Sequence, residues 1–298
     1  MDNPYRIEGP ALISFSGGRT SGYMLWHILD AHGGTLPEDV HVCFANTGKE
    51  REETLRFVHE CATRWGVRVR WLEWRRPDVP KRTRLAPELR FEEVGFNSAS
   101  RNGEPFAALI ANRIILPNAV TRYCTSALKV NTMDAFMRAQ GYVRWNNAVG
   151  LRWDEMLRVF KQIERNKAGN NRYTAVMPMA TQATKVTRRM ILDWWARQPF
   201  NLQLRGYEGN CDLCFLKSEK SLKRLIRDNP GMADWWAAQE LSAVSRTRDP
   251  RMANFNKAFT YAELEREVAD SPLLDLDFMT DDEEFDAECG LWCAGDAA

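Results

Sequence analysis

The spacing of apolar residues over the first 75 positions predicts alternating strands and helices. Short apolar runs from Ala11 to Phe15, His41 to Asn46 and Val67 to Trp74 predict strands. Between them, residues 20–32 and 52–65 carry apolar side chains at helical spacing. This rhythm is typical of right-handed crossovers and a parallel sheet, with ligands at the carboxyl ends of the strands. We therefore expect an α/β fold, a Rossmann-like twisted parallel sheet with flanking helices.

The pattern after residue 75 is less regular. We expect a long loop from Pro77 to Gly103, a strand from Trp145 to Val149 and a helix from Val186 to Gln198. The predicted organisation is a nucleotide-binding α/β domain over residues 1–205. A mainly helical, cysteine-containing region with an acidic tail is predicted over residues 206–298.

The composition is that of an ordinary globular protein. Of the 298 residues 44% are hydrophobic and 27% charged, and the formal net charge is +1, which gives no general argument for a nucleic-acid binder. No apolar run approaches the roughly 18 residues of a membrane span, and the N-terminus lacks a signal-peptide pattern. We expect a cytoplasmic protein without a membrane partner. Seven cysteines, an odd number, favour thiol or metal chemistry over a disulfide framework.

The turn between the first predicted strand and helix is rich in glycine and hydroxyl side chains. Two glycines allow the backbone to come close to a ligand, and backbone amide donors at a helix N-terminus can bind phosphate or sulfate. The spacing fits neither GxxxxGK[ST] nor GxGxxG. It resembles the SGGxxS loop of the PP-loop superfamily, which contains ATP pyrophosphatases, tRNA-thiolating enzymes and sulfonucleotide reductases. The alternative is a Gly-Gly turn without a ligand. The nucleotide contacts that this resemblance implies are Ser14, Ser16, Gly17, Gly18, Arg19, Thr20 and Ser21.

Three later segments follow the order found in phosphoadenosine phosphosulfate reductases and their relatives. They are a strand ending in Thr-Gly, a helix start with a cysteine and a lysine, and a Gly-Leu-Arg segment with a second arginine beyond it. Arginine suits bidentate binding of phosphate or sulfate oxygens, although a surface Arg-Glu pair would explain the same pattern. The resemblance implies nucleotide contacts for Asn46, Thr47, Gly48, Gly150 and Arg158, and catalytic roles for Lys129 and Arg152. The nucleotide would be ATP, adenylyl sulfate or phosphoadenylyl sulfate.

A CxxC pair, Cys211 and Cys214, predicts a redox pair, half of a zinc site or part of an iron-sulfur site. Together with Cys124 it resembles the cluster pattern of adenosine phosphosulfate reductases, where a Cys-Cys pair precedes the CxxC. Tyr123 stands where the first cysteine of that pair would be. Three thiolates can hold a 4Fe-4S cluster and leave one iron open, as in several PP-loop thiolating enzymes. Zinc, with a further cysteine from the tail, is the alternative.

The C-terminal stretch from Glu288 to Trp292 is similar to the Glu-Cys-Gly-[Ile/Leu]-His tail of sulfonucleotide reductases, with tryptophan replacing histidine. The resemblance implies that Cys289 is a nucleophile that attacks the sulfur of the substrate. A thioredoxin-like reductant thiol would then release the S-sulfonate. Separately, arginines and tryptophans interleave from Arg64 to Arg90, which would suit single-stranded nucleic acid or a solvated face.

Three functions are therefore open. The first is thiol-dependent reduction of an adenylyl sulfate. The second is ATP-dependent, iron-sulfur-dependent thiolation of a nucleic acid or nucleotide, which needs a sulfur donor. The third is a non-catalytic nucleotide-binding accessory protein of DNA modification with a structural metal. The tail and Thr20 favour the first, which is the function that we expect. Tyr123, Trp292 and the basic segment from Arg64 to Arg90 favour the second.

Overall fold

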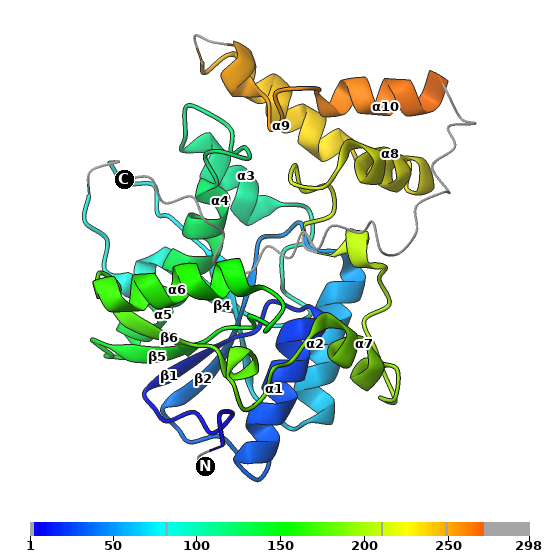
Figure 1. Ribbon diagram of the computed structural model, residues 1–298. Coiled ribbons are helices and arrows are strands. Elements are labelled where there is room, and N and C mark those ends of the chain that lie inside the picture. Colours follow the sequence, from blue (N-terminus) through cyan, green and yellow to red (C-terminus); the bar gives the residue numbers. More distant parts are fainter. Residues whose placement is uncertain (1–2, 81–82, 210, 248–249, 271–298) are drawn as a thin grey trace.

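A six-stranded sheet forms the centre of the computed structural model, which describes residues 3–80, 83–209, 211–247 and 250–270 (Figure 1). The strand order is β4-β3-β2-β1-β5-β6. All neighbouring strands are parallel except β3 and β4. The predicted α/β class is thus confirmed. The strands are β1 Ala11–Ser14, β2 Val40–Asn46, β3 Val69–Trp74, β4 Phe91–Val94, β5 Trp145–Ala148 and β6 Tyr173–Val176.

Strand β1 lies at the point where the strand order reverses. Its Ser14 pairs with Cys43 of β2, and its Ile13 pairs with Ala148 of β5. The chain runs outward from β1 through β2 and β3, and later returns to the other side of β1 as β5. Ligands of open α/β sheets bind at the carboxyl ends of the strands at such a reversal. The glycine-rich turn after β1 lies there.

Helices cover both faces of the sheet (Figure 1). Successive residues of a strand point to opposite faces. Accordingly Ile13 belongs to a core with α1, α2 and α7, whereas Leu12 belongs to a core with α5. Helix α6 packs against β6 and the segment that follows β5. The helices of this part of the chain are α1 Arg19–Ala31, α2 Glu52–Arg64, α5 Asn131–Ala139, α6 Met156–Ala168 and α7 Arg188–Trp195.

The C-terminal region is mainly helical, as predicted. Helices α8 Glu219–Asp228, α9 Asp234–Val244 and α10 Tyr261–Asp270 share a hydrophobic core with α3 Glu104–Ala111. Helix α3 lies about a hundred positions before residue 205, the predicted domain boundary. The core of the C-terminal helices therefore contains residues from both sides of that boundary. Among the described helices, none combines the length and apolarity that crossing a bilayer requires.

The predicted loop from Pro77 to Gly103 contains the edge strand β4, which the sequence analysis did not find. Its four residues include two glutamates, so it lacks the apolar run of a buried strand. These glutamates pair with arginines of the basic segment: Arg70 lies 3.0 Å from Glu93, and Arg75 lies 2.8 Å from Glu92. Some of the positive charge that suggested nucleic-acid binding is thus paired with carboxylates of the same sheet edge.

Candidate functional site

The turn after β1 requires glycine because α2 packs directly against it. Gly17 has a φ of +79°, and a Cβ atom there would lie 2.7 Å from Cγ2 of Thr54. The serines close the turn: Ser16 N–H donates to the Ser21 hydroxyl at 3.2 Å, and the two hydroxyls lie 2.9 Å apart. Sequence and packing together therefore build a compact loop that leads into α1, the geometry that anion binding needs.

Two predicted contact residues of this loop hold neighbouring segments. The Arg19 guanidinium donates to Asn201 Oδ1 at 2.9 Å and to the Leu204 carbonyl at 2.9 Å. The Ser14 hydroxyl donates to Asn147 Oδ1 on β5 at 2.8 Å. Both side chains belong to the scaffold of the loop, and their nucleotide contacts stay predictions.

The Gly-Leu-Arg segment after β5 reaches the same loop across 132 positions of sequence. An ideal Cβ at Gly150 would lie 3.6 Å from Cα of Ser21. Arg152, 5% exposed, donates to the Thr20 hydroxyl at 3.4 Å and to Asp154 at 2.9 Å. A buried guanidinium thus lies beside the first turn of α1, where a bound anion would need a positive charge.

Arg158 and Glu155 form an ion pair one helical turn further along. Glu155 also accepts a hydrogen bond from the Arg152 backbone N–H at 2.9 Å. Arg158 therefore forms an Arg-Glu pair, the alternative that the sequence left open beside anion binding. Its contact with a nucleotide stays a prediction.

The turn after β2 is held from several directions. Asn46 donates to the fully buried Glu73 at 2.6 Å, and Thr47 donates to Glu50 through both its N–H and its hydroxyl at 2.8 Å. Gly48 has a φ of +79° and lies against Gly103, so that a Cβ would be 3.0 Å from Cα of Gly103. Hydrogen bonds and close packing thus define the conformation of the Asn46–Gly48 turn.

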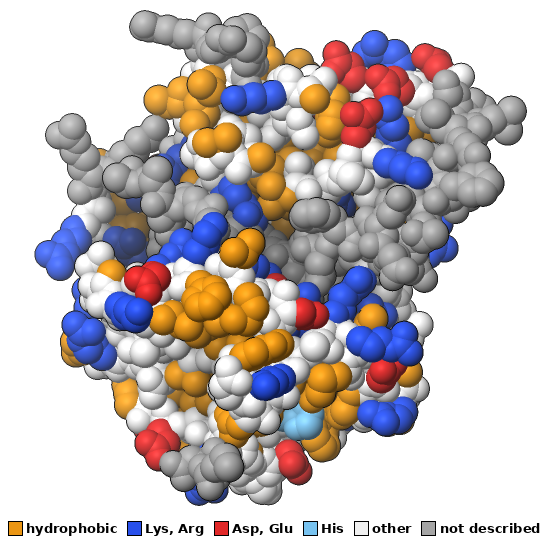
Figure 2. Space-filling model, viewed as in Figure 1, with side chains coloured by type: hydrophobic (Ala, Val, Ile, Leu, Met, Phe, Trp, Pro, Cys, Tyr) orange, Lys and Arg blue, Asp and Glu red, His pale blue; other side chains and the backbone are white. Residues whose placement is uncertain are grey.

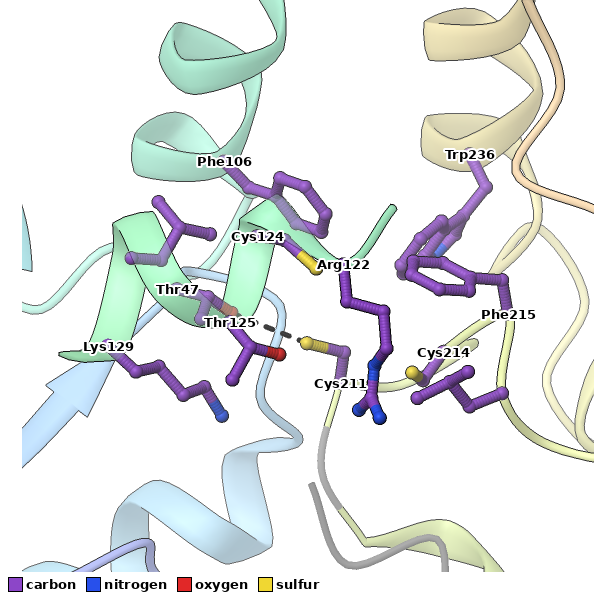
Figure 3. A pocket seen from close by; sticks show the side chains of 12 residues that line it. Thr47, Phe106, Arg122, Cys124, Thr125, Lys129, Cys211, Cys214, Phe215 and Trp236 are labelled. Atoms are coloured by element: carbon purple, nitrogen blue, oxygen red, sulfur yellow. Dashed lines mark hydrogen bonds between the residues drawn. The ribbon is translucent and has the colours of Figure 1, made fainter. Parts of the chain in front are cut away.

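The three predicted metal ligands line one hollow of about 400 Å³, a volume that includes its opening to solvent. Cys124 comes from the short helix α4 Tyr123–Thr125, and the other two cysteines come from the CxxC turn. Figure 3 shows the three thiols facing the space between α4 and that turn. The hollow is lined by Thr47, Phe106, Arg122, Cys124, Thr125, Leu128, Lys129, Cys211, Cys214, Phe215, Leu216 and Trp236.

Charges of both signs surround the CxxC turn. Burial, and then the carboxylate of Glu50, raises the pKa of Cys211, whereas Lys129 opposes this effect. Lys129 Nζ lies 3.7 Å from Glu50 Oε1. Lys217 Nζ donates to the Cys211 carbonyl at 3.1 Å, and burial lowers the pKa of this lysine. Figure 2 shows further Lys and Arg side chains gathered along the hollowed band between the sheet and the C-terminal helices.

Within the described ranges, no three His, Cys, Asp or Glu side chains are gathered closely enough to hold a single metal ion. Soft thiolate donors are nevertheless the ligands that iron-sulfur clusters use. Phe106, Phe215 and Trp236 give the hollow apolar walls, and the apolar shell around a metal site controls the access of solvent to it. The thiols surround a hollow, and this arrangement suits a polynuclear cluster.

A comparison with known proteins relates the chain to a phage protein. It is 30% identical over 238 residues to the uncharacterised nin region protein ORF290 of Escherichia phage lambda, covering 74% of this chain and 71% of the phage protein. The chain belongs to the ORF290 family. No family model matches it. The phage protein is uncharacterised, so a function for this chain has to be argued from the site.

In this ORF290-family chain, Tyr123 stands where the resemblance to adenosine phosphosulfate reductases would place a cysteine. Its hydroxyl donates to the Ile115 carbonyl at 2.7 Å, and its ring packs against the C-terminal core. Cys43 and Cys61 are fully buried in the hydrophobic cores, where a thiol acts as a small apolar side chain. The predicted nucleophile Cys289 lies outside the described residues.

Sequence analysis missed three polar residues that hold the site together: Lys49, Glu50 and Asp212. All are at least partly buried, and their ion-pair partners lie more than 70 positions away along the chain. The one local signal was that Lys49 and Glu50 directly follow the Thr-Gly turn.

Proposed function

We propose that this protein binds an adenine nucleotide at the loop after β1 and carries out sulfur chemistry at the three-cysteine hollow. One observation supports this most. Thr47 belongs to the predicted nucleotide-binding turn and also lines the hollow, where its hydroxyl lies 3.5 Å from the Cys211 thiol. A nucleotide-activated group at the strand ends would therefore be adjacent to sulfur ligands.

Nucleotide binding is supported by three features that meet at the carboxyl end of β1. The tight Gly17 turn leads from β1 directly into α1, the N-terminus of this 13-residue helix is electropositive, and Arg152 places a buried guanidinium beside it. In the described structure this guanidinium pairs with Asp154 at 2.9 Å and with Glu155 at 3.7 Å, and a bound anion would join these two carboxylates around it.

A 4Fe-4S cluster held by Cys124, Cys211 and Cys214 fits the donor set and the shape of the hollow. When bound, it would supply an iron with a coordination position not occupied by cysteine. Lys129 and Arg122 would offset the negative charge of the thiolates. Zinc at the same cysteines is the competing assignment.

The arrangement suits ATP-dependent thiolation. In that reaction a substrate oxygen is adenylated and pyrophosphate leaves; sulfur from a donor then replaces that oxygen, and AMP leaves. Three cysteines, with Tyr123 in place of a fourth, support this reaction.

Reduction of an adenylyl sulfate is the second candidate, and the cysteine of the Glu-Cys-Gly-Leu tail supports it. Cys289 thiolate would attack the sulfur, the S–O bond to AMP would break, and a reductant dithiol would release sulfite and become a disulfide.

The test is anaerobic purification followed by iron, sulfide and zinc analysis and ATP-binding calorimetry. We expect about four irons and four sulfides per chain. Cys124→Ala should lose them, and Cys61→Ala, a control cysteine buried on α2, should keep them. One zinc per chain without sulfide would overturn the cluster, and failure to bind any adenine nucleotide would overturn the whole proposal.

A further inference from the structure

The turn that follows β2 is joined to the CxxC turn by its backbone. The Asp212 N–H donates to the Lys49 carbonyl at 2.7 Å, and Glu50 and Cys211 form an isolated antiparallel bridge. Asp212 lies between the two cysteines of the CxxC. The cysteine turn is therefore built directly onto the residues that follow the Asn46–Gly48 turn.

A buried ion pair reinforces this junction. Lys49 Nζ lies 2.8 Å from Asp212 Oδ2, and the two side chains are only 8% and 14% exposed. The ammonium group also lies 4.8 Å from the centre of the Trp235 ring on α9. Desolvating two charges is costly, so a pair of this kind is weak evidence for stability and better evidence for a defined geometry.

Asp212 uses its other oxygen to fix the cysteine turn. Its Oδ1 accepts hydrogen bonds from the Leu213 N–H at 2.7 Å and from Trp236 Nε1 at 2.9 Å. One carboxylate thus connects the CxxC backbone, helix α9 and the lysine of the nucleotide-side turn. A displacement of Lys49 would be passed to both neighbouring cysteines.

We propose that Lys49 and Asp212 are positioning residues that couple nucleotide occupancy to the cysteine hollow. A nucleotide bound against the Asn46–Gly48 turn would restrict movement of the adjacent Lys49, and through Asp212 it would restrain the CxxC turn. Coupling between two sites is reciprocal, so the state of the cysteines also changes nucleotide affinity. This inference rests on the proposed nucleotide site.

The experiment measures alkylation of Cys211 in the full-length, reduced, iron-free protein. Iodoacetamide is added with and without saturating ATP or adenylyl sulfate, and peptide mass spectrometry follows each cysteine. Nucleotide binding is measured separately by calorimetry. We expect bound nucleotide to slow Cys211 alkylation at least about fivefold in the wild type, a factor equivalent to about 1 kcal/mol of coupling.

Lys49→Met and Asp212→Asn should bring this ratio close to one while nucleotide still binds. Asp212→Asn is the gentler variant, because its amide oxygen can keep both Oδ1 hydrogen bonds. In the double variant the loss should equal that of either single variant, since the two residues act as one unit. Lys223→Met is the control, because this lysine pairs with Glu219 and Glu267 away from the turn.

Three results would overturn the inference. Protection of Cys211 could persist in both variants with nucleotide bound, or bound nucleotide could leave wild-type alkylation unchanged. Lys223→Met could also lose protection as fully as Lys49→Met. Failure of the wild type to bind either nucleotide is a different result, because calorimetry would then reject the proposed function itself.

Discussion

The Thr47 hydroxyl lies 3.5 Å from the Cys211 thiol, although the two residues are 164 positions apart in the sequence. The same hydroxyl donates to Glu50 at 2.8 Å and accepts from the Lys49 N–H at 3.2 Å. One side chain therefore connects the predicted nucleotide turn, the buried carboxylate and the cysteine hollow.

Removing this hydroxyl should be costly. Thr47→Val leaves the Lys49 N–H without its acceptor and Glu50 with one donor fewer, so the free energy of unfolding should fall by about 1–3 kcal/mol. Urea denaturation measures the change. Thr47→Ser retains the hydroxyl and should lose less than half as much. Equal losses in the two variants would show that the methyl group, not the hydroxyl, matters at this position.

Gly17→Ala should destabilise the protein by about 2–4 kcal/mol, because it combines a left-handed backbone with overpacking against Thr54. Gly33→Ala is the matched control. Gly33 also has a positive φ of +69°, but a Cβ there meets nothing within 4 Å. It should cost only about 1 kcal/mol. Denaturant titration gives the free energy of unfolding of both variants, and thermal unfolding checks it. An equal loss in Gly17→Ala and Gly33→Ala would contradict the packing explanation.

Arg152→Lys should weaken binding of ATP or adenylyl sulfate at least about tenfold, because an ammonium group cannot reproduce a planar, bidentate guanidinium. Calorimetry measures the affinity. Arg158→Lys should change it less than about threefold, since Arg158 pairs with Glu155. If both variants bind as tightly as the wild type, the anion site lies elsewhere.

The stability of the C-terminal region should depend on pH through Glu240. This buried carboxylate accepts hydrogen bonds from the N–H groups of Phe255 and Tyr261, and burial raises its pKa from 4.5 to about 7. The folded state therefore holds a proton that the unfolded chain releases. The stability that results is complete below about pH 4.5 and is lost as the pH rises through about 7.

Denaturation between pH 5 and pH 8 should accordingly show the free energy of unfolding falling by up to about 3 kcal/mol. Glu240→Gln should flatten this profile. The exposed Glu263, whose pKa is lowered by hydrogen bonds from Thr260, serves as control: Glu263→Gln should leave the slope over this range unchanged. A slope that survives in Glu240→Gln would assign the dependence to another group.

Cys289→Ser separates the two candidate reactions. If the protein reduces an adenylyl sulfate, release of sulfite and AMP should stop, because the serine hydroxyl does not replace the thiolate nucleophile. If it thiolates a substrate with ATP, turnover should persist within about twofold. Cys293→Ser is the neighbouring control in the tail. Sulfite release that continues in Cys289→Ser would exclude this cysteine as the nucleophile.

Local sequence was sufficient for most elements of the sheet. The apolar runs at β1, β2, β3 and β5 and the helical spacing of α1 and α2 predicted each element to within two residues. Such patterns work because strand and helix formation depend on neighbours a few residues away. The short, charged β4 escaped prediction because its stability comes from the ladder with β3 and from ion pairs with its arginines.

For the site, the sequence by itself determined the residue types: a glycine turn that only glycine can form, three thiols and an arginine after β5. Tertiary structure alone decided which of them meet. Helix α3, 100 positions before the CxxC, shares a core with α8 to α10 and brings Cys124 to the same hollow as the other thiols. The tertiary structure also places the Arg19 side chain against residues 201–204 and pairs Lys49 with Asp212. These contacts depend on how distant segments pack, and no local pattern contains that information.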